Sequence, residues 1–539
     1  MEKKYEFWLD TTAKKIIERE ERLKRGTKIF RTESGLGASG FPHIGSFGDV
    51  ARNFAASLAL KDRGVESELI AYSDDMDGLR KVPLTLPDWL EKYIGMPVSN
   101  IPDPVGKCHN SFGEHIRSLL LDALDKTGIE YNHHSATEDY KKGIFNEKIE
   151  TLLLNSDKIG KIVKETIGQE KFIGALPYFP VCEKCGKMYT TRTYELLPKE
   201  HKVLYVCDQE FVGKNVNNGK EIVVKGCGHK GEASYLNGNG KMSWKVEFAM
   251  RWSALQIVFE ACGKDILDSV KVNDAISKEV LGFEPPLHIF YEMFLDKGGK
   301  KIAKSFGNVF TPQVWFNYGT PKSLILLMLK RFEGTRELDI TDIPKYMDEL
   351  DKLENVFFGL EEITDVRELT NSKRLFEYAN FLKPPEKPSL NVAYNTMLEI
   401  ARILPGEGQV EFVVKKLKDF GLIEKDSEEI RNAVRERLDF AKNWLKDFYK
   451  AEQEEVSISK EESKAIEELI ASIKTEKDGE ILQTRIFEIA KSNGIQPKEF
   501  FSLLYKIILK SERGPRLGAY ILEVGKDEII KKLKGSLSG

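Results

Sequence analysis

The order of hydrophobic and polar positions divides the chain into regions with different expected folds. Residues 28–32 (KIFRT) and 67–73 (SELIAYS) are short apolar runs that are typical of buried strands. Between them, residues 46–63 follow a glycine-rich turn and carry apolar side chains at helical spacing. A strand, a glycine-rich turn, a helix and a second strand predict a βαβ unit, and therefore a parallel sheet that binds ligands at the carboxyl ends of its strands.

The middle of the chain changes character several times. Residues 83–110 are rich in proline and turn residues, and residues 111–175 have a helical pattern. Residues 180–235 combine short strand patterns with glycine turns, four cysteines and a histidine, which indicates a small inserted module. Residues 242–268 again favour a helix, and residues 288–296 (HIFYEMFLD) favour a strand.

Beyond residue 330 the pattern is almost entirely that of amphipathic helices, broken near residues 383–388, 404–408 and 493–497. The predicted fold class is therefore an α/β region of Rossmann type with a cysteine-rich insertion, followed by an all-α C-terminal region.

Composition narrows the class of protein. The chain has 539 residues, enough for three or four domains, and its 41% hydrophobic and 31% charged residues are ordinary for a soluble protein. No apolar run approaches the roughly 20 residues of a membrane span, and the start (MEKKYEFWLD) lacks the apolar stretch of a secretory signal. Six cysteines are too few for a disulfide scaffold, so we expect a protein of the reducing cytoplasm. Because no membrane span is predicted, we also expect no membrane partner.

The net charge of −3 gives no global basic field that would attract nucleic acid, and DNA is not an expected partner. Basic residues nevertheless outnumber acidic ones over residues 491–539. Two interpretations stay open for that segment, a chance fluctuation among solvated side chains and a basic contact surface.

The first chemical motif is Phe-Pro-His-Ile-Gly-Ser at residues 41–46, where the first strand gives way to a helix. The amide groups at a helix N-terminus form a site for anionic phosphate. His43 could donate a hydrogen bond to a phosphate oxygen, and Gly45, next to Ser46, would allow a purine ring or phosphate to approach the backbone.

The second motif lies in a glycine-rich loop, residues 298–308, where Lys301 and Lys304 precede Ser305. Two such lysines can neutralise charge that develops in nucleotidyl transfer.

Together the two motifs resemble the HIGH and KMSKS signatures of class I aminoacyl-tRNA synthetases. The surrounding sequence is similar to that of class I lysyl-tRNA synthetases, the type found in most archaea and some bacteria. This similarity rests on residues 33–52, 73–83, 242–255, 282–309 and 514–529. The departures are Ser46 in place of the second histidine of HIGH, Ile302 and Ala303 inside the lysine motif, and Ile266 where the family usually has histidine.

The resemblance implies a domain order. Residues 1–95 would form the first half of a Rossmann catalytic domain, residues 96–240 an insertion with one or more zinc modules, and residues 241–330 the second half of the catalytic domain. Residues 331–390 would form a helical connecting region that contacts the tRNA stem, and residues 391–539 an all-helical anticodon-binding domain.

The resemblance also implies the reaction. Lysine would attack the α-phosphate of ATP, which is accompanied by Mg²⁺, and the resulting lysyl-adenylate would pass its aminoacyl group to the terminal adenosine of tRNA(Lys). His43, Lys301, Lys304 and Ser305 would be the catalytic residues, with Gly45 and Ser46 beside the ATP.

A lysine pocket needs an anion for the ε-ammonium and an apolar wall for the stem. Candidates for the substrate site are Glu33, Ser34, Gly35, Asp74, Trp244, Glu247 and Trp252. Among the acids, Glu33 lies closest in sequence to the glycine-rich turn and is the expected partner of the ε-ammonium. The alternative is that Glu33 binds the α-amino group while Asp74 or Glu247 holds the ε-ammonium. Each tryptophan could equally be an ordinary core residue.

Two clusters have the donors of a zinc site. Cys182, Cys185, Cys207, Cys227 and His229 lie in CxxCG and CGH knuckles, which are typical of a structural zinc ribbon. Five candidates compete for four positions, and the spacing leaves open whether Cys207 or Cys227 joins His229. The second cluster consists of Asp103, Cys108, His109 and His115, in a region where the family binds metal; it could hold a second zinc or be a polar turn before a helix.

Two other functions remain to be separated from lysine–tRNA ligation. The first is a class I synthetase for glutamate or cysteine, although a glutamate pocket would need an arginine where this chain offers acids. The second is a non-catalytic tRNA-binding paralogue, which the intact histidine and lysine motifs disfavour.

Overall fold

A computed structural model of the chain describes residues 6–295, 310–331, 334–404, 408–449, 457–509 and 514–537. The chain divides into two compact units, Met1–Ser389 and Leu390–Gly539. Within the described ranges, no helix has both the length and the apolar character needed to cross a membrane.

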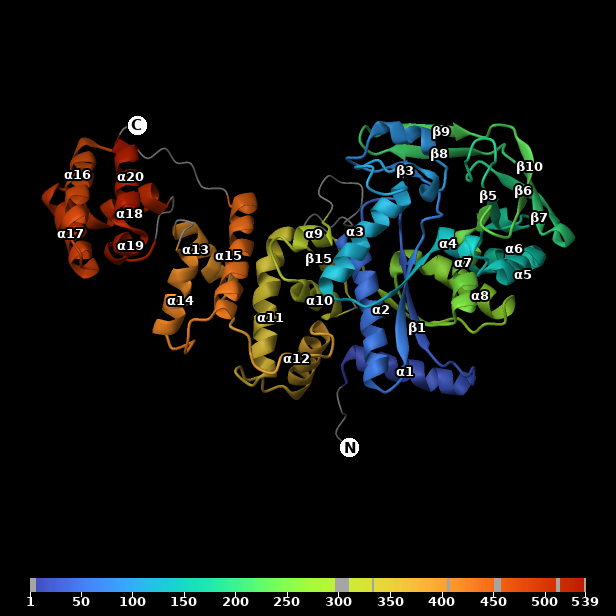
Figure 1. The fold of residues 1–539 in the computed structure, drawn as a ribbon, viewed down its shortest axis with the longest axis horizontal. Helices are drawn as coiled ribbons and strands as arrows, with labels where there is room; N and C mark the ends of the chain where they lie inside the picture. The colour runs from blue at the N-terminus through green and yellow to red at the C-terminus, as the bar shows by residue number, and fades with distance from the viewer. Residues whose placement is uncertain are drawn as a thin grey trace. The chain divides into compact units, whose positions relative to one another are not determined.

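The first unit is built on a five-stranded parallel sheet with the order β13-β12-β1-β2-β4. Its strand β1 is labelled beside α2 in Figure 1. The strands are β1 (Phe30–Leu36), β2 (Ser67–Ser73), β4 (Asn132–Ser135), β12 (Ile257–Gly263) and β13 (Leu287–Tyr291). The prediction of a helix over residues 242–268 is wrong beyond Leu255, because the apolar run that follows pairs as β12 between β1 and β13. Helix α2 (Ile44–Asp62) connects β1 to β2, so the predicted βαβ unit is confirmed. The first strand extends further into the glycine-rich segment than the apolar run indicated, because the sheet pairing continues to Leu36 opposite Ser73.

Strand β4 has the sequence NHHS and lies within the range predicted as an insertion, yet it pairs with β2 in the central sheet. It is an edge strand whose first residue is exposed, and it therefore lacks the apolar pattern by which buried parallel strands are recognised. The remaining strands of the insertion form three small sheets, with the orders β10-β7-β6, β3-β8-β9 and β11-β5. Two of these sheets also include a strand from beside the insertion, β3 or β11. Their bounds are β3 (Lys81–Val82), β5 (Tyr178–Pro180), β6 (Arg192–Leu197), β7 (Lys202–Val206), β8 (Glu210–Asn215), β9 (Glu221–Lys225), β10 (Lys230–Ser234) and β11 (Gly240–Met242).

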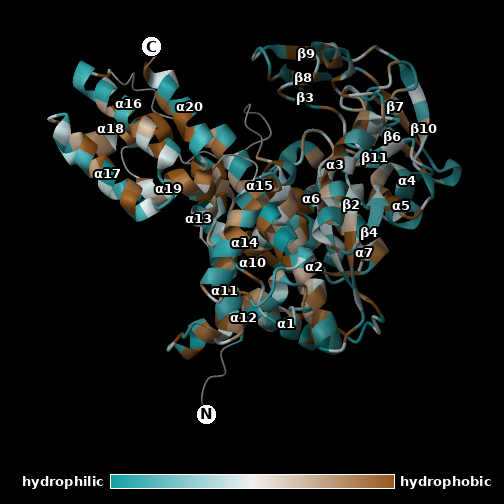
Figure 2. Ribbon diagram, turned by 60° about the vertical axis from the view of Figure 1, so that its left-hand side comes forward, coloured by the Kyte–Doolittle hydropathy of each residue, from teal (hydrophilic) through white to brown (hydrophobic). Residues whose placement is uncertain are grey.

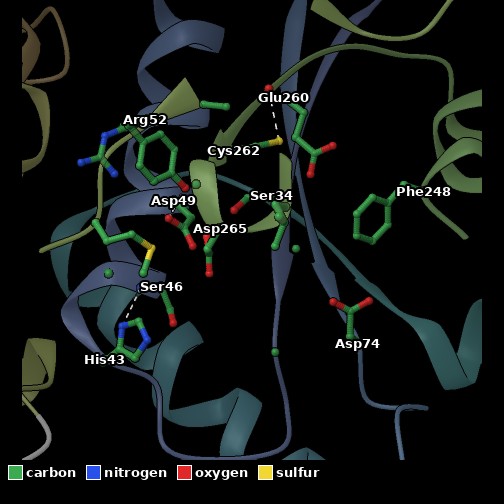
Figure 3. Close-up of a pocket in the computed structure, with 18 of the residues that line it drawn as sticks. Ser34, His43, Ser46, Asp49, Arg52, Asp74, Phe248, Glu260, Cys262 and Asp265 are labelled. Carbon is green, nitrogen blue, oxygen red and sulfur yellow. Dashed lines mark hydrogen bonds between the residues drawn. The ribbon is translucent and has the colours of Figure 1, made fainter. Parts of the chain in front are cut away.

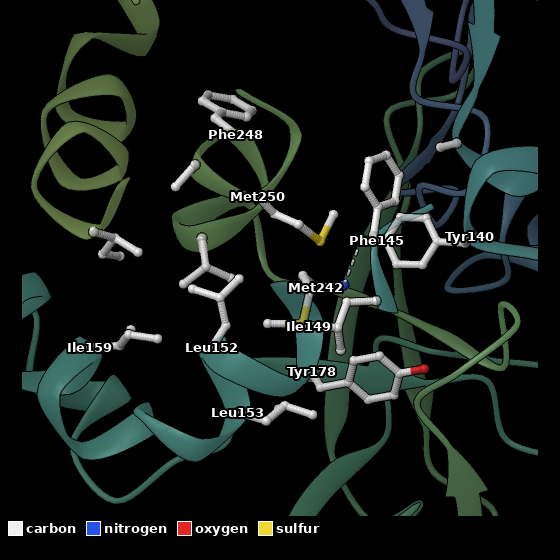
Figure 4. Close-up of a cluster of buried hydrophobic side chains, with 14 of the residues drawn as sticks. Tyr140, Phe145, Ile149, Leu152, Leu153, Ile159, Tyr178, Met242, Phe248 and Met250 are labelled. Carbon is white, nitrogen blue, oxygen red and sulfur yellow. Dashed lines mark hydrogen bonds between the residues drawn. The ribbon is translucent and has the colours of Figure 1, made fainter. Parts of the chain in front are cut away.

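A buried cluster joins the insertion to the catalytic sheet (Figure 4). Helices α5 (Asn146–Leu154) and α6 (Ser156–Ile167) place Ile149, Leu152 and Ile159 in this cluster. Helix α7 (Trp244–Leu255) contributes Met250 and other apolar side chains to the same cluster. Because α7 also borders the catalytic sheet, its position depends on packing from both regions.

The helical part of the chain begins in the first unit, with α10 (Pro321–Leu329), α11 (Ile343–Phe357) and α12 (Val366–Ala379). One short parallel pair, β14 (Phe294–Leu295) with β15 (Arg336–Glu337), interrupts the predicted all-helical pattern. The described elements of the second unit are all helices, α13 to α20, with bounds Tyr394–Ile403, Gln409–Asp419, Glu428–Phe448, Lys460–Thr475, Gly479–Ser492, Pro497–Leu509, Leu517–Val524 and Lys526–Leu537. These helices carry both hydrophobic and hydrophilic residues, as expected for amphipathic helices (Figure 2).

Asn53 joins α2 to the central strand β12. Its side-chain oxygen accepts a hydrogen bond from the backbone N–H of Ala261 at 2.8 Å, and its amide nitrogen donates to the carbonyl of Ala261 at 3.3 Å. The backbone carbonyl of Asn53 also accepts from the Thr32 hydroxyl at 3.0 Å. Asn53 is fully buried, so these bonds hold the helix in register with β1 and β12 without competition from water.

We predict that Asn53→Leu lowers the free energy of unfolding by about 1–3 kcal/mol, because the buried N–H of Ala261 loses its acceptor. Chemical denaturation of the purified protein measures this change. The matched control is Asn132→Leu on the exposed end of β4, which should change stability by less than about 0.5 kcal/mol. Equal effects of the two substitutions would contradict the role of Asn53.

Candidate active site

A pocket of about 280 Å³ opens at the carboxyl ends of β1, β12 and β13, beside the N-terminus of α2 (Figure 3). This is the place where parallel α/β sheets bind ligands. The pocket is lined by Ser34, Gly35, Gly37, His43, Gly45, Ser46, Asp49, Arg52, Asp74, Trp244, Phe248, Arg251, Glu260, Ala261, Cys262, Gly263, Asp265, Ile266, Tyr291, Glu292, Met293 and Phe294.

His43 is the N-cap of α2. The backbone N–H of Ser46 donates to His43 Nδ1 at 3.2 Å, so in the neutral ring the proton lies on Nε2. Gly45 makes this arrangement possible, because a Cβ atom at that position would lie 2.7 Å from Cε1 of the imidazole. The ring is thus folded over the start of the helix, and the helix N-terminus and a histidine donor face the same part of the pocket.

The three acids expected to bind lysine are already paired with protein cations. Glu33 is fully buried, and its Oε1 lies 2.7 Å from Arg251 Nη2. The other terminal nitrogen of Arg251 donates to Asp74 Oδ1 at 2.8 Å. Glu247 lies 2.8 Å from the ammonium of Lys241. Glu33, the expected partner of the substrate ε-ammonium, is thus paired with Arg251, which comes from a helix more than 200 residues away in sequence. Its role toward lysine stays a prediction.

The pocket is lined by Ser34 and Gly35, at the carboxyl end of β1, and by Asp74, directly after β2, as the sequence predicts. The two tryptophans that were candidates for the apolar wall differ in their position relative to the pocket. Trp244 lines the pocket, whereas Trp252 is fully buried in the core and donates from Nε1 to the carboxylate of Glu260 at 2.7 Å. Ile266, which replaces the family's usual histidine, is also part of the lining.

Four acids of the pocket lining, Asp49, Glu260, Asp265 and Glu292, were missed by sequence reasoning, and two of them have notable surroundings. Glu260 lies in the middle of β12, where burial raises the pKa of its carboxyl to about 7. Asp49, one turn into α2, accepts a hydrogen bond from the hydroxyl of Tyr291, and the guanidinium of Arg52 lies 4.2 Å from the centre of the same tyrosine ring. The available signal for Glu260 was an acidic residue inside an otherwise apolar run, IVFEACG. For Asp49 it was the i, i+3 spacing from Ser46 on the same helix.

Lys301, Lys304 and Ser305 fall outside the described residues. Their placement relative to the pocket therefore stays a prediction.

Four cysteine thiols converge in the insertion. Cys182 Sγ lies 3.7 Å from Cys227 Sγ, and Cys185 Sγ lies 3.7 Å from Cys207 Sγ. All four sulfur atoms lie within 4.8 Å of one another. A tetrahedral zinc ion with Zn–S bonds of about 2.3 Å requires sulfur atoms about 3.8 Å apart, so the set fits structural zinc.

His229 is not part of this set. Its Nε2 lies 2.7 Å from Glu183 Oε1 at the surface, and the structure unites both Cys207 and Cys227 with the first pair. The prediction that His229 replaces one of these cysteines is therefore wrong, because the four thiols converge without the His229 ring. The knuckle turns at Gly228, which has a positive φ of 74°, and the ring of His229 contacts Glu183 and does not join the thiols; residue spacing alone does not reveal this.

The second cluster also converges. His115 Nδ1 lies 3.2 Å from both His109 Nδ1 and Asp103 Oδ2, and 3.4 Å from Cys108 Sγ. Burial acts to raise the pKa of Asp103, but hydrogen bonds from the backbone N–H groups of Val105 and His109 outweigh it and lower the pKa to about 2. The carboxylate is thus ionised and fits a cation site.

Comparison with known proteins places the chain among the tRNA synthetases. Residues 6–381 match the family model described as tRNA synthetases class I (K). The chain is 46% identical over 531 residues, 98% of each sequence, to a protein of Cenarchaeum symbiosum (strain A) named lysine–tRNA ligase. It is 30% identical over 544 residues, again 98% of each, to a protein of the same name from Rickettsia africae (strain ESF-5).

Among solved structures, the chain is similar to the glutamate–tRNA synthetase of Elizabethkingia anophelis, with a TM-score of 0.44, 14% identity and coverage of 95% of this chain and 100% of the other. The family match over more than half of the sequence, with the near full-length relatives, is decisive. This chain belongs to the class I (K) tRNA synthetases.

Proposed function

We propose that this protein is a lysine–tRNA ligase, which forms lysyl-adenylate from L-lysine and ATP and transfers the lysyl group to the 3′ adenosine of tRNA(Lys). The observation that carries this proposal is the 46% identity to a lysine–tRNA ligase over 98% of both chains. The pocket is consistent with it, because its lining holds five acidic residues, Asp49, Asp74, Glu260, Asp265 and Glu292, against two arginines. Such a balance favours a cationic amino acid.

Glutamate is disfavoured as the substrate by the same lining. The guanidinium of Arg251 is bonded to Glu33 and Asp74, so it is not available for a substrate carboxylate. Arg52 lies over the ring of Tyr291, beside Asp49.

In the proposed mechanism the protein acts mainly by positioning and by charge neutralisation. The N-terminus of α2 and Nε2 of His43 would bind phosphate oxygens of ATP, next to Gly45 and Ser46. Lys301, Lys304 and Ser305 would bind the departing pyrophosphate, and Mg²⁺ would enter with the ATP. Water would be displaced when lysine and ATP fill the pocket, which strengthens these contacts.

The remaining regions have proposed roles in tRNA binding. Residues 331–390 would contact the tRNA stem, and residues 391–539 would bind the anticodon, with the catalytic domain split between residues 1–95 and 241–330 around the insertion at 96–240. The protein would act in the cytoplasm.

Structural zinc would be held by Cys182, Cys185, Cys207 and Cys227, and a second zinc by Asp103, Cys108, His109 and His115. Four protein ligands close each site, so we propose no catalytic role for either ion.

We predict that the purified full-length chain catalyses ATP–pyrophosphate exchange with lysine and not with glutamate or cysteine. If exchange requires tRNA, addition of tRNA(Lys) restores it, so both conditions are measured. Exchange driven by glutamate or cysteine would replace the proposed substrate. No exchange with any amino acid under either condition would favour the alternative of a non-catalytic tRNA-binding paralogue.

We predict that Gly45→Ala lowers the exchange rate by roughly 10²-fold, because the new methyl group displaces the His43 ring and a small misplacement of a catalytic group has an effect of this size. The control is Gly535→Ala, a helical glycine with no atom within 4 Å of the added methyl, which should keep the wild-type rate. A wild-type rate in Gly45→Ala would remove His43 from the proposed mechanism.

We predict that Cys182→Ser combined with Cys185→Ser releases about one zinc ion per chain and destabilises the module at residues 180–235, since metal binding contributes folding free energy. Elemental analysis measures the zinc content. Cys262→Ser, which removes a buried cysteine outside the four-thiol set, should retain as much zinc as the wild type. The zinc ribbon would have to be abandoned if the double variant retained it as well.

A further inference from the structure

Glu260 is a deeply buried acid of the pocket to which the proposed mechanism gives no role. It lies in the centre of β12, a strand in which every residue is buried, and only 7% of its surface is exposed. A carboxylate at such a position is unfavourable unless it is hydrogen-bonded and paired with a positive charge.

The structure supplies the hydrogen bond and leaves out the positive charge. Trp252 Nε1 donates to Glu260 Oε2 at 2.7 Å and thereby orients the carboxylate. Among the described residues, Glu260 takes part in no ion pair, whereas Glu33, Asp74 and Glu247 each pair with Arg251 or Lys241. Burial and the nearby charge of Glu33 raise the pKa of Glu260 to about 7, and the charge of Arg251, which is paired with Glu33 and Asp74, only partly opposes this shift.

The position of Glu260 in the pocket indicates which cation would complete it. His43 and Ser46 lie at one end of the pocket, and Glu260 lies at the opposite end (Figure 3). In adenylate formation the carboxylate of the amino acid must lie at the phosphate end. The ε-ammonium of lysine, four methylene groups from the α-carbon, then extends away from His43, along the apolar side chains of Trp244 and Phe248.

We propose that Glu260 is the counter-ion of the lysine ε-ammonium and therefore the side chain by which the pocket selects lysine. This inference rests on the proposed function and names its specificity residue. Binding would replace an unpaired buried carboxylate with a buried ion pair. Amino acids without a terminal ammonium would leave the carboxylate unpaired and would be rejected.

The test compares lysine with 6-hydroxynorleucine, in which a hydroxyl replaces the ε-ammonium, in ATP–pyrophosphate exchange by the full chain. Glu260→Gln keeps an acceptor for Trp252 and removes the charge. We expect its kcat/KM for lysine to fall roughly 30-fold to several-thousand-fold, the range for losing one partner of a buried charge pair. The value for 6-hydroxynorleucine should change by no more than a few fold, so the preference for lysine disappears.

Inhibition by 6-aminohexanoate, which keeps the ε-ammonium and lacks the α-amino group, separates the two amines of lysine. We expect this compound to inhibit the wild type and to lose affinity for Glu260→Gln. If the variant instead keeps both this inhibition and its preference for lysine, while binding 6-hydroxynorleucine more weakly, Glu260 holds the α-ammonium and the inference is wrong. An equal loss for lysine and 6-hydroxynorleucine would also overturn it.

Two further variants control for folding and for general loss of charge. Glu260→Asp retains the carboxylate on a shorter side chain and should keep part of the preference for lysine, even if Glu260→Gln folds poorly. Asp122→Asn removes an exposed carboxylate outside the pocket and should leave the ratio of lysine to 6-hydroxynorleucine at the wild-type value. Absence of lysine-dependent exchange in the wild type would contradict the proposed function itself, whereas an unchanged preference in Glu260→Gln contradicts only the assignment of Glu260.

Discussion

The arrangement of the pocket depends on one buried cation, Arg251. Its guanidinium bonds Glu33 of β1 and Asp74 at the end of β2, and it lies 4.3 Å from the centre of the Tyr72 ring. Charges removed from water must be paired, so α7 cannot shift relative to β1 and β2 without leaving a carboxylate uncompensated. The same ion pairs decide which acids of the pocket remain available to a ligand.

The space around Arg251 shows how closely these parts fit. A Cβ atom at Gly35 would lie 3.5 Å from Asp74 Oδ2 and 3.9 Å from Arg251 Nη2, so any larger side chain there would enter the network. On its other face, α7 packs into the cluster formed with α5 and α6 of the insertion. The insertion therefore supports the helix that carries Arg251, although it contains none of the residues at the phosphate end of the pocket. The insertion also contains the four-thiol cluster and the cluster of Asp103, Cys108, His109 and His115, both of which have the side chains of a metal site.

Much of the fold could be predicted from the sequence, and so could the part of the site that depends on local geometry. Apolar runs on either side of a glycine-rich turn indicated β1, α2 and β2, because a parallel strand buried on both faces must be apolar. His43 lies at the start of a helix because Phe41–Ser46 ends the short glycine-rich turn that follows β1, and the local sequence contains that geometry. Cys182 and Cys185 were recognised for the same reason, since a CxxC knuckle is defined by neighbouring residues.

The tertiary structure decided the partners that come from distant segments. No spacing near Glu33 reveals that Arg251, from a helix beyond the insertion, pairs with it, and no spacing near Cys207 excludes His229 from the thiol cluster. Strand β4 was hidden for a related reason, because an edge strand gains its place from pairing with β2 rather than from its own apolar residues. The sequence by itself determined the βαβ unit, the helical second half and the motifs, which depend on neighbours along the chain. Only the tertiary structure decided which acid has a cation and which does not, because the pairing of buried charges depends on segments brought together by folding.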